Sequence, residues 1–364
     1  MKRTALLGAA VALVLAGCSS TPNANAPASA GGQTTAAGVA DKALVIAWIS
    51  PDATTSTRWD TQDRPAFEAA VQQLAPGAKV LSSTASTDAA MIQAGEAAIT
   101  QGAQVIVINP ITNDGSVPLV DEAHKAGVSV ISYEGLIGGT DVNGYITFDN
   151  LKVGELQAQY VVDHVAKGST IALVNGAQVC EACIDFKKGA HQILDPLVSS
   201  GAIKLGYEAD TPSWLASNAQ TETEQALTKV GDNLAGIVAA NDGLAGGVVA
   251  ALKARQLNGK VVVTGQDATT AGLQSILLGD QTMTVYKDFH QQAKAAAQAA
   301  VALARGQKDA TGLTATYDNS GHTVPALFLD PQVIDKGSIK KVFDDGFVTK
   351  AQICTGDVAS HCDF

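Results

Sequence analysis

The chain has 364 residues, which is enough for about two domains of roughly 150 residues each. Its 35 acidic and 24 basic side chains give a formal net charge of −11, and without a cluster of Lys and Arg this argues against nucleic acid, whose phosphates need cations. Hydrophobic residues make up 46% and charged residues 16%, a composition that supports buried cores and excludes a wholly disordered chain.

The first residues indicate an export signal. Lys2-Arg3 precedes an apolar run at 5–15, which is shorter than the roughly 20 residues that a membrane span needs. The run ends Leu15-Ala16-Gly17-Cys18, which resembles the lipobox of bacterial lipoproteins, where the cysteine becomes the lipidated first residue. The alternative is a free cysteine beside an ordinary cleavage site. We expect a signal peptide over 1–17 and lipidation of Cys18.

A polar stretch follows the lipobox. Residues 19–41 are mainly Ser, Thr, Pro, Asn, Ala and Gly, which cannot bury enough apolar surface to order themselves. We therefore expect residues 18–42 to be the lipidated cysteine and a flexible tether. No later segment has enough consecutive apolar residues to cross a bilayer. The expected location is the outer face of the cell membrane, periplasmic or at the cell surface, with contact to the membrane through the lipid anchor only.

Four further cysteines suggest two disulfides, because an even number in an oxidising compartment favours pairing. The sequence-local pairing is Cys180–Cys183 and Cys354–Cys362, and two other pairings remain possible. The CxxC spacing of the first pair also fits a redox motif, but that motif normally opens a helix in a much smaller domain. Zinc could bind beside His361, but four ligands at finger-like spacing are absent, so we expect no metal.

The body of the chain alternates apolar runs with segments of helical periodicity. The first run, 44–49, is continuously apolar, as in a strand that is buried on both faces. The predicted strands are 44–49, 79–81, 105–108, 128–132, 170–174, 203–207, 236–239 and 260–264. The predicted helices are 65–74, 88–101, 116–126, 153–165, 186–198, 217–230 and 243–254. This alternation predicts an α/β fold with two similar doubly wound parallel-sheet lobes.

Polar residues stand just after several of these strands, where ligands bind in parallel α/β sheets. They are Ser50, Asn109, Glu134, Asn175, Asn241 and Asp267. Each could instead cap the following helix or form a turn. Their shared placement favours a ligand cleft between the two lobes.

Motifs for catalysis and nucleotide binding are missing. The sequence has no GxxxxGK[ST], no GxGxxG after the first strand, no GxSxG and no HExxH. Its six histidines are scattered and show no triad spacing. We therefore expect a binding protein with no catalytic residues and no cofactor.

Several stretches resemble the sugar-binding proteins of bacterial uptake systems, and most closely their xylose-binding members. The similarity keeps order and spacing from about residue 44 to 348, and it is most specific in Ile146-Thr147-Phe148-Asp149-Asn150, Lys152-Val153-Gly154-Glu155-Leu156-Gln157, Ala240-Asn241-Asp242, Gly265-Gln266-Asp267-Ala268 and Gln281-Thr282-Met283-Thr284-Val285-Tyr286-Lys287. The resemblance implies the type I periplasmic binding fold, with the ligand in a cleft and three segments crossing between lobes.

We place these crossings near Asp149, Lys287 and Thr323. The N-terminal lobe would then hold residues 43–148 plus 288–322. The C-terminal lobe would hold residues 149–287 plus 323–364.

The resemblance also implies ligand-binding residues in the first lobe and on an aromatic loop. Arg58, followed by Trp59, matches an Arg-Trp pair whose arginine bonds sugar hydroxyls. Glu134 matches an aspartate, and Trp214 matches an aromatic side chain that stacks on the sugar, since a sugar's C–H face packs well on an indole. The alternative for Arg58 is a surface ion pair with Asp60 or Asp63.

Three more polar residues match ligands of the second lobe and the hinge. They are Asn241, Asp267 and Lys287. Sugar hydroxyls both donate and accept hydrogen bonds, so charged and amide groups suit them. Asn241 and Asp267 could instead act only as helix caps, and Lys287 could be solvated.

Two positions depart from the family pattern. Gly135 follows Glu134 where the family has an arginine, and the Cys180–Cys183 segment replaces a stretch with an asparagine near Ala182. A site that has lost hydroxyl contacts discriminates differently, so we expect a pentose other than xylose, or an acyclic polyol of four to five carbons.

The resemblance implies an extracytoplasmic solute-binding lipoprotein, expected to be a monomer. It would capture a small neutral sugar, xylose or a relative, by lobe closure and deliver it to an ABC permease. The alternatives are a polyol-binding protein and a receptor that serves a membrane sensor. A sugar-responsive repressor is opposed by the export signal, and an exported enzyme would need Glu134 and Asp267 as a carboxylate pair.

Overall fold

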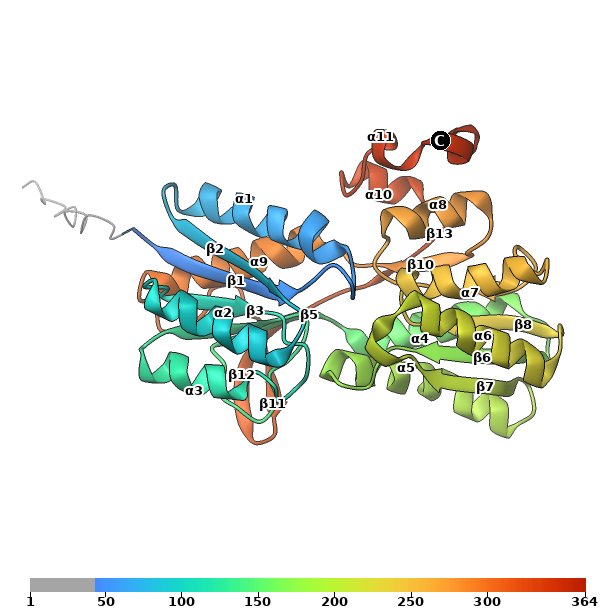
Figure 1. Ribbon diagram of the computed structural model, residues 1–364, viewed down its shortest axis with the longest axis horizontal. Coiled ribbons are helices and arrows are strands. Elements are labelled where there is room, and N and C mark those ends of the chain that lie inside the picture. Colours follow the sequence, from blue (N-terminus) through green and yellow to red (C-terminus); the bar gives the residue numbers. More distant parts are fainter. Residues whose placement is uncertain (1–42) are drawn as a thin grey trace, which may run out of the picture. The chain divides into compact units, whose positions relative to one another are not determined.

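A computed structural model describes residues 43–364, so the predicted signal peptide, Cys18 and the tether lie outside the described residues. The described strands form three sheets, and Figure 1 shows helices packed along them. Within this part of the chain, no helix is both long enough and apolar enough to span a membrane.

The larger sheet has seven strands in the order β11-β12-β5-β4-β3-β1-β2. All neighbours in it are parallel except β11 and β12. Its strands are β1 Val45–Pro51, β2 Lys79–Ala85, β3 Val105–Ile108, β4 Ser129–Tyr133, β5 Gly144–Phe148, β11 Ala315–Asn319 and β12 His322–Leu329. The helices packed on it are α1 Arg64–Leu74 and α9 Phe289–Ala304 on one face, and α2 Asp88–Thr100 and α3 Val117–Lys125 on the other.

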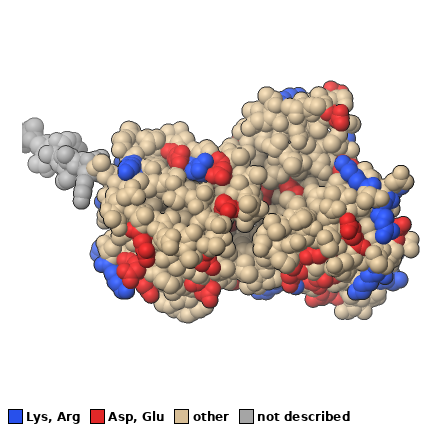
Figure 2. Space-filling view, in the orientation of Figure 1, with Lys and Arg blue, Asp and Glu red and all other residues tan. Residues whose placement is uncertain are grey.

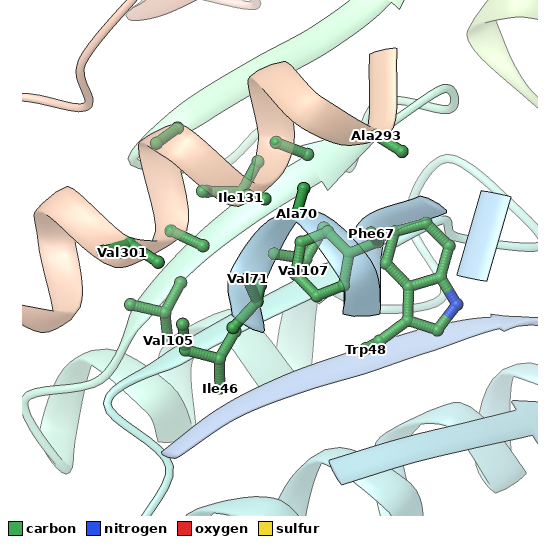
Figure 3. Packing of buried hydrophobic residues seen from close by; sticks show 14 of the residues in the cluster. Ile46, Trp48, Phe67, Ala70, Val71, Val105, Val107, Ile131, Ala293 and Val301 are labelled. Atoms are coloured by element: carbon green, nitrogen blue, oxygen red, sulfur yellow. The ribbon is translucent and has the colours of Figure 1, made fainter. Parts of the chain in front are cut away.

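The two faces of this sheet explain the continuous apolar run in β1. Successive strand residues point to opposite faces, so Ile46 and Trp48 enter the core under α1 and α9, while Ala47 and Ile49 enter the core under α2 and α3. Figure 3 shows the first of these cores, where the rings of Trp48 and Phe67 lie with centroids 4.8 Å apart. Both faces are covered, so every position of the strand from Ile46 onward is buried.

The second sheet has four parallel strands in the order β7-β6-β8-β9. They are β6 Thr170–Asn175, β7 Lys204–Asp210, β8 Leu234–Ala239 and β9 Val262–Val263. One face packs on α4 Asn150–His164 and α5 Glu181–Ser199, and the other on α6 Ala216–Val230 and α7 Asp242–Ala254. We call the seven-stranded sheet with its helices the first lobe, and the four-stranded sheet with its helices the second lobe.

A short antiparallel pair and the C-terminal residues extend the second lobe. Strand β10, Met283–Tyr286, pairs with β13, Gln332–Asp335, and one bridge joins Gln266 to Val285. The remaining elements are α8 Thr270–Leu278, α10 Lys340–Asp344, α11 Lys350–Ile353, and the short helical turns η1 Trp59–Asp63, η2 Pro212–Trp214 and η3 Gly356–His361.

The predicted α/β fold with two parallel-sheet lobes is confirmed. The predicted third crossing near Thr323 is wrong, because β12 stays paired with β5 as far as Leu329. Val324 and Ala326 are fully buried in the core of the first lobe, so the strand cannot leave the sheet before them. The chain therefore leaves this sheet after Leu329. The other predicted lobe boundaries remain predictions.

The structure joins the cysteines in the sequence-local pairing. Cys180 pairs with Cys183 and Cys354 pairs with Cys362, with Cα atoms 5.2 and 6.1 Å apart. The first bridge lies at the start of α5, which begins at Glu181 rather than at the predicted residue 186. Its early start has a local cause, since Cys180 caps the helix by accepting a hydrogen bond from the backbone N–H of Cys183.

Candidate ligand-binding site

A cavity of about 520 Å³ lies beyond the carboxyl ends of the strands, with residues of both lobes in its wall. Its volume is in the range typical of small-molecule sites, which is about 300–1,000 Å³. All the predicted ligand-binding residues line it: Arg58, Trp59, Glu134, Trp214, Asn241, Asp267 and Lys287. Of the other polar strand-end residues, Asn109 lines the cavity, but Ser50 and Asn175 do not.

Arg58 is the centre of a buried ion-pair network and not a surface residue, because its side chain is only 2% exposed. Its Nε and Nη2 donate to the two carboxylate oxygens of Asp63 at 3.0 and 2.8 Å, a two-point contact that fixes the guanidinium plane. Its Nη1 donates to Glu134 at 3.1 Å, and the guanidinium lies 3.5 Å from the ring centre of Phe289. Burial alone would lower the pKa of Arg58, but the carboxylates around it raise that pKa well above its usual value.

Glu134 connects the two cations of the network. Its Oε1 accepts hydrogen bonds from Arg58 and from the ammonium of Lys287, and its Oε2 accepts one from Gln292 at 3.1 Å. Burial opposes its ionisation, but Arg58 and Lys287 outweigh burial and lower the pKa of Glu134 from 4.5 to about 2. Glu134 is therefore an anion at neutral pH. Lys287 is fully buried in this network, which contradicts the alternative of a solvated side chain.

Asp267 brings the network across to the second lobe. Its Oδ1 lies 3.4 Å from Arg58 Nη1 and 3.3 Å from Lys287 Nζ, the longest ion-pair distances in the network. It does not cap α8, since Thr269 does so by accepting the N–H of Gly272. Two cations thus face the three carboxylates of Asp63, Glu134 and Asp267, which leaves a formal charge of 2 − 3 = −1.

Two indoles form apolar parts of the cavity wall. Trp59 is buried and donates its Nε1–H to Thr55 at 3.1 Å. Trp214 is half-buried and lies directly on the backbone of Gly176, where an added Cβ would come within 1.9 Å of the indole. A side chain at residue 176 would push the ring away, so this glycine permits the close approach.

Asn241 has both of the roles that the sequence left open. Its Oδ1 caps α7 by accepting the N–H of Leu244 at 2.9 Å, and the residue also lines the cavity. The cap occupies the amide oxygen. The Nδ2 donor is the part of this side chain that a ligand could use.

Sequence reasoning did not include Gln292 or Gln266 in the site, and it considered Asp63 only as a surface partner of Arg58. Asp63 and Gln292 lie behind the cavity and hold Arg58, with Gln292 accepting from its Nη2 at 3.2 Å. Gln266 lines the cavity, and its Oε1 is buried without a hydrogen-bond partner among the described residues. An unpartnered buried acceptor is costly unless a ligand or water satisfies it.

Several residues of the cavity wall have positive φ although they are not glycine. The angles are 60° at Glu134, 57° at Trp214 and 93° at Asp267. Such a conformation costs on the order of 1–3 kcal/mol for a residue with a Cβ, and in folded proteins it is concentrated at functional sites. Glu134 is held in it by two hydroxyls, because Thr147 and Tyr145 both donate to its carbonyl oxygen.

The two departures from the family pattern both lie in the cavity wall. Gly135 packs so closely that an added Cβ would lie 3.0 Å from the Oδ1 of Asn109. Cys180 and Cys183 line the cavity on the side of the second lobe. Both positions are therefore able to affect ligand choice.

Outside this network, the features that could form another site are clusters of charged side chains and groups of side chains that could bind a metal. On the face shown in Figure 2, Lys and Arg lie in small groups among uncharged and acidic residues. Within residues 43–364, no group of three or more His, Cys, Asp or Glu side chains is arranged to hold a metal ion. The predicted absence of catalysis, of a metal and of a cofactor stays a prediction.

Comparison with known proteins gives a family match and close relatives. Residues 46–308 match the model of the periplasmic binding protein domain. A D-xylose-binding periplasmic protein of Haemophilus influenzae is 40% identical over 298 residues, which are 81% of this chain and 88% of that protein. A xylitol-binding protein of Mycolicibacterium smegmatis is 25% identical over 266 residues, which are 72% of this chain and 73% of that protein.

A solved structure agrees with the same assignment. The carbohydrate transporter solute-binding protein of Chloroflexus aurantiacus, crystallised with D-glucose, aligns with a TM-score of 0.78 and 29% identity. The alignment covers 85% of this chain and 98% of that one. The two-lobed fold predicted from the sequence is therefore shared with a sugar-binding protein.

Proposed function

Because this chain belongs to the periplasmic binding protein family, we propose that it captures a monosaccharide, xylose or a related pentose, between its two lobes. One observation carries the proposal: charged groups, amides and two indoles from both lobes line one cavity of about 520 Å³. Hydrogen bonds to charged groups contribute roughly 1.5–3 kcal/mol each, so a few of them suffice for micromolar binding, near −8 kcal/mol. The name and 40% identity of the D-xylose-binding relative support a pentose.

The proposed mechanism is capture by lobe closure, the hinge motion known for periplasmic binding proteins. The Asp267 contacts to Arg58 and Lys287, at 3.4 and 3.3 Å, are the longest ion pairs of the network, so they lose least when the groups move apart and a hydroxyl takes the place of the direct contact. A hydroxyl between these groups can accept from a cation and donate to a carboxylate. The ligand would stabilise the closed form only as far as it binds that form more tightly than the open one.

The proposal has two further parts. The protein acts as a monomer and delivers the sugar to an ABC permease. A lipid on Cys18 anchors it to the outer face of the cell membrane. Replacement of Cys18 by Ala should release the exported protein from the membrane fraction and abolish metabolic labelling with a radioactive fatty acid. A matched Cys354→Ala variant should keep both properties. Unchanged membrane retention of Cys18→Ala would contradict the anchor.

A second candidate ligand is an acyclic polyol of four to five carbons. Gly135 and the Cys180–Cys183 bridge favour it, because both replace groups that bond sugar hydroxyls in the family pattern. The xylitol-binding relative, at 25% identity, supports the same candidate.

Calorimetric titration with D-xylose, L-arabinose, D-ribose, xylitol and D-glucose tests the ligand. We expect a pentose to bind with micromolar affinity and to be recovered unchanged after incubation, as from a protein without catalytic activity. A tighter fit of xylitol than of every pentose would favour the second candidate. Binding of none of the pentoses would contradict the proposal, and xylose as clearly the tightest ligand would contradict the argument from the two departures.

A further inference from the structure

The turn that the first disulfide closes separates two hollows of the molecule. We call residues 179–183 the disulfide turn. Val179, Cys180, Ala182 and Cys183 line the ligand cavity. A second hollow of about 670 Å³ lies on the other side of the turn. Glu181 and Val179 line it together with residues of the first lobe. The turn is thus a thin wall, and its position decides whether the ligand cavity is closed on this side.

Glu181 ties this wall to the first lobe through Asn113, which follows β3. The backbone N–H of Glu181 donates to Asn113 Oδ1, and Asn113 Nδ2 donates to Glu181 Oε2 at 3.3 Å. The backbone N–H of Asn113 also donates to the carbonyl oxygen of Val179 at 3.0 Å. Three hydrogen bonds therefore join one residue of the first lobe to the disulfide turn of the second.

Tyr317 of β11 adds a second point of attachment. Its hydroxyl donates to Glu181 Oε1 at 3.2 Å, and its ring packs edge to face on Tyr145 with centroids 5.6 Å apart. Burial and the nearby Glu181 carboxylate both raise the pKa of Tyr317 above its usual value, so the phenol keeps its proton at neutral pH. Both carboxylate oxygens of Glu181 are thus held by the first lobe.

The bridge keeps the turn in the shape that these contacts need. Cys180 and Cys183 are three residues apart, and the bridge closes the loop that contains Glu181. The Sγ of Cys180 also caps α5, so Glu181 is the first residue of a helix whose start is fixed. A covalently closed turn has few other conformations, which lowers the entropy lost when Glu181 docks.

We propose that Glu181 is a positioning residue that fastens the disulfide turn to the first lobe and thereby slows ligand release from the cavity. The inference rests on the proposed function, since it assumes that the cavity holds the captured sugar. It differs from a direct ligand contact, because Glu181 faces the second hollow and does not line the ligand cavity.

Stopped-flow tryptophan fluorescence measures the two rate constants separately, since Trp59 and Trp214 line the cavity. With D-xylose and xylitol as probes, Glu181→Ala should raise the dissociation rate constant about tenfold and change the association rate constant less than about twofold. The two hydrogen bonds of the Glu181 carboxylate must break before the sugar leaves, whereas the sugar enters molecules in which they are already broken. Glu181→Gln keeps an acceptor for Tyr317 and should stay within about threefold of the wild type. Equal dissociation rates in Glu181→Ala and wild type would overturn the inference.

Hydrogen exchange of the ligand-free proteins tests the same attachment without any ligand. Glu181→Ala should speed exchange in the peptides that contain residues 111–116 and 178–184, and leave the strands of both sheets unchanged. If neither sugar probe binds the wild type, the proposed ligand class fails and this exchange still decides the attachment. Unchanged exchange in both peptides would show that Glu181 does not fasten the turn.

The two disulfides provide a matched pair for the role of the bridge. Cys180→Ser with Cys183→Ser keeps a good helix cap at residue 180 and removes only the covalent closure. We expect it to raise the dissociation rate constant at least about threefold and to speed exchange at 178–184. The same double replacement at Cys354 and Cys362, which are remote from the cavity wall, should leave both readings at wild-type values. The same change in both variants would assign the effect to general loosening and contradict the inference.

Discussion

The two walls of the cavity differ in how fully their groups are already bonded. On the first lobe, most of the hydrogen-bonding atoms of Arg58 and Glu134 are already bonded to Asp63, to Gln292 or to each other. On the second lobe, the wall contains the half-buried indole of Trp214, the disulfide turn and an asparagine that already caps a helix. It also contains Asp267, whose ion pairs are the longest in the network, and Gln266, whose amide oxygen has no hydrogen-bond partner among the described residues. The first wall is therefore held by its own internal bonds, whereas the second leaves more of its apolar area and polar atoms free for a ligand.

This difference predicts which substitutions damage folding as well as binding. A charged group that is held by buried partners leaves an unpaired charge when it is removed. Removal of an aromatic ring at the edge of a cavity only makes the cavity wall shallower and leaves no unpaired charge. The following predictions run from the largest expected effect on affinity to the smallest.

Arg58→Ala should abolish measurable binding, with affinity reduced at least about 100-fold, and should destabilise the fold by about 3–5 kcal/mol, because Asp63 and Glu134 lose their shared buried partner. Arg58→Lys restores the charge without the two-point contact and should recover only part of either loss. Calorimetry and urea unfolding measure the two effects. An Arg58→Ala variant that is stable and binds within threefold of wild type would show that the first wall is not organised around this residue.

Asp267→Asn should weaken binding about tenfold or more. The carboxylate is the group of the network that reaches both cations from the second lobe, and asparagine tolerates the positive φ of this position. Thermal unfolding should stay near the wild-type temperature, which separates this effect from that of Arg58. Calorimetry with the tightest sugar of the panel measures it, and an unchanged affinity would remove Asp267 from the site.

Trp214→Ala should weaken binding about tenfold, which is the smallest effect expected for Asp267→Asn. Stability should change little, because the half-buried ring contributes stacking area and no hydrogen bond that holds the fold. Trp214→Phe keeps a flat ring and should lose less. Tyr207→Phe, which removes a hydrogen bond to Gln225 away from the cavity, is the control and should bind like wild type. Equal affinity of Trp214→Ala and this control would contradict stacking on Trp214.

Asp242→Asn should leave the affinity within about twofold of wild type and change how stability depends on pH. Asp242 is buried and accepts hydrogen bonds from the N–H of Thr269 and from Gln281, both at 2.8 Å. Burial, with a smaller effect of Asp267, raises its pKa from 3.8 to about 7. The folded protein therefore keeps a proton that the unfolded chain releases, and the wild type loses stability as pH rises from about 4 to about 7.

Asparagine has no proton to release, so this loss should disappear in the variant. Relative to wild type, Asp242→Asn should gain roughly 3 kcal/mol between pH 5 and pH 8, because about two pH units lie between pH 5 and the pKa of about 7, at about 1.4 kcal/mol per unit. Urea unfolding at the two pH values measures the gain. Parallel stability curves for the two proteins would mean that Asp242 is already ionised at pH 5.

Much of the fold could be predicted because its signals are local. Strands buried on both faces appear as apolar runs such as β3, whose predicted bounds 105–108 match the structure. The end of β12 was misjudged although residues 324–329 form an apolar run, because an apolar run does not by itself show where a strand leaves its sheet. The continuation of β12 to Leu329 depends on pairing with β5, about 180 residues earlier, and no local pattern encodes that pairing.

The candidate site divides in the same way. Residues that follow a strand, such as Glu134 and Asp267, could be found because the strand itself could be found. Asp63 could be named as a possible partner of Arg58 because it is close in sequence, but its burial could not be predicted. Gln292 could not be found, because it reaches Arg58 from α9, far along the chain. Gln266 stands beside Asp267 in the sequence, but only the structure distinguishes an unpartnered buried amide from an ordinary one.

The positive φ angles at Glu134, Trp214 and Asp267 have a consequence for protein engineering. Each angle is one that glycine adopts without strain, but the carboxylates of Glu134 and Asp267 are paired with buried cations, so glycine at either position would leave an unpaired charge. Trp214 has no such partner, so a library selected only for heat resistance should accumulate glycine at residue 214 and lose the indole from the cavity. Thermostable descendants obtained without a ligand in the screen should therefore be better folded and bind more weakly, a trade between stability and activity that the backbone at this position imposes.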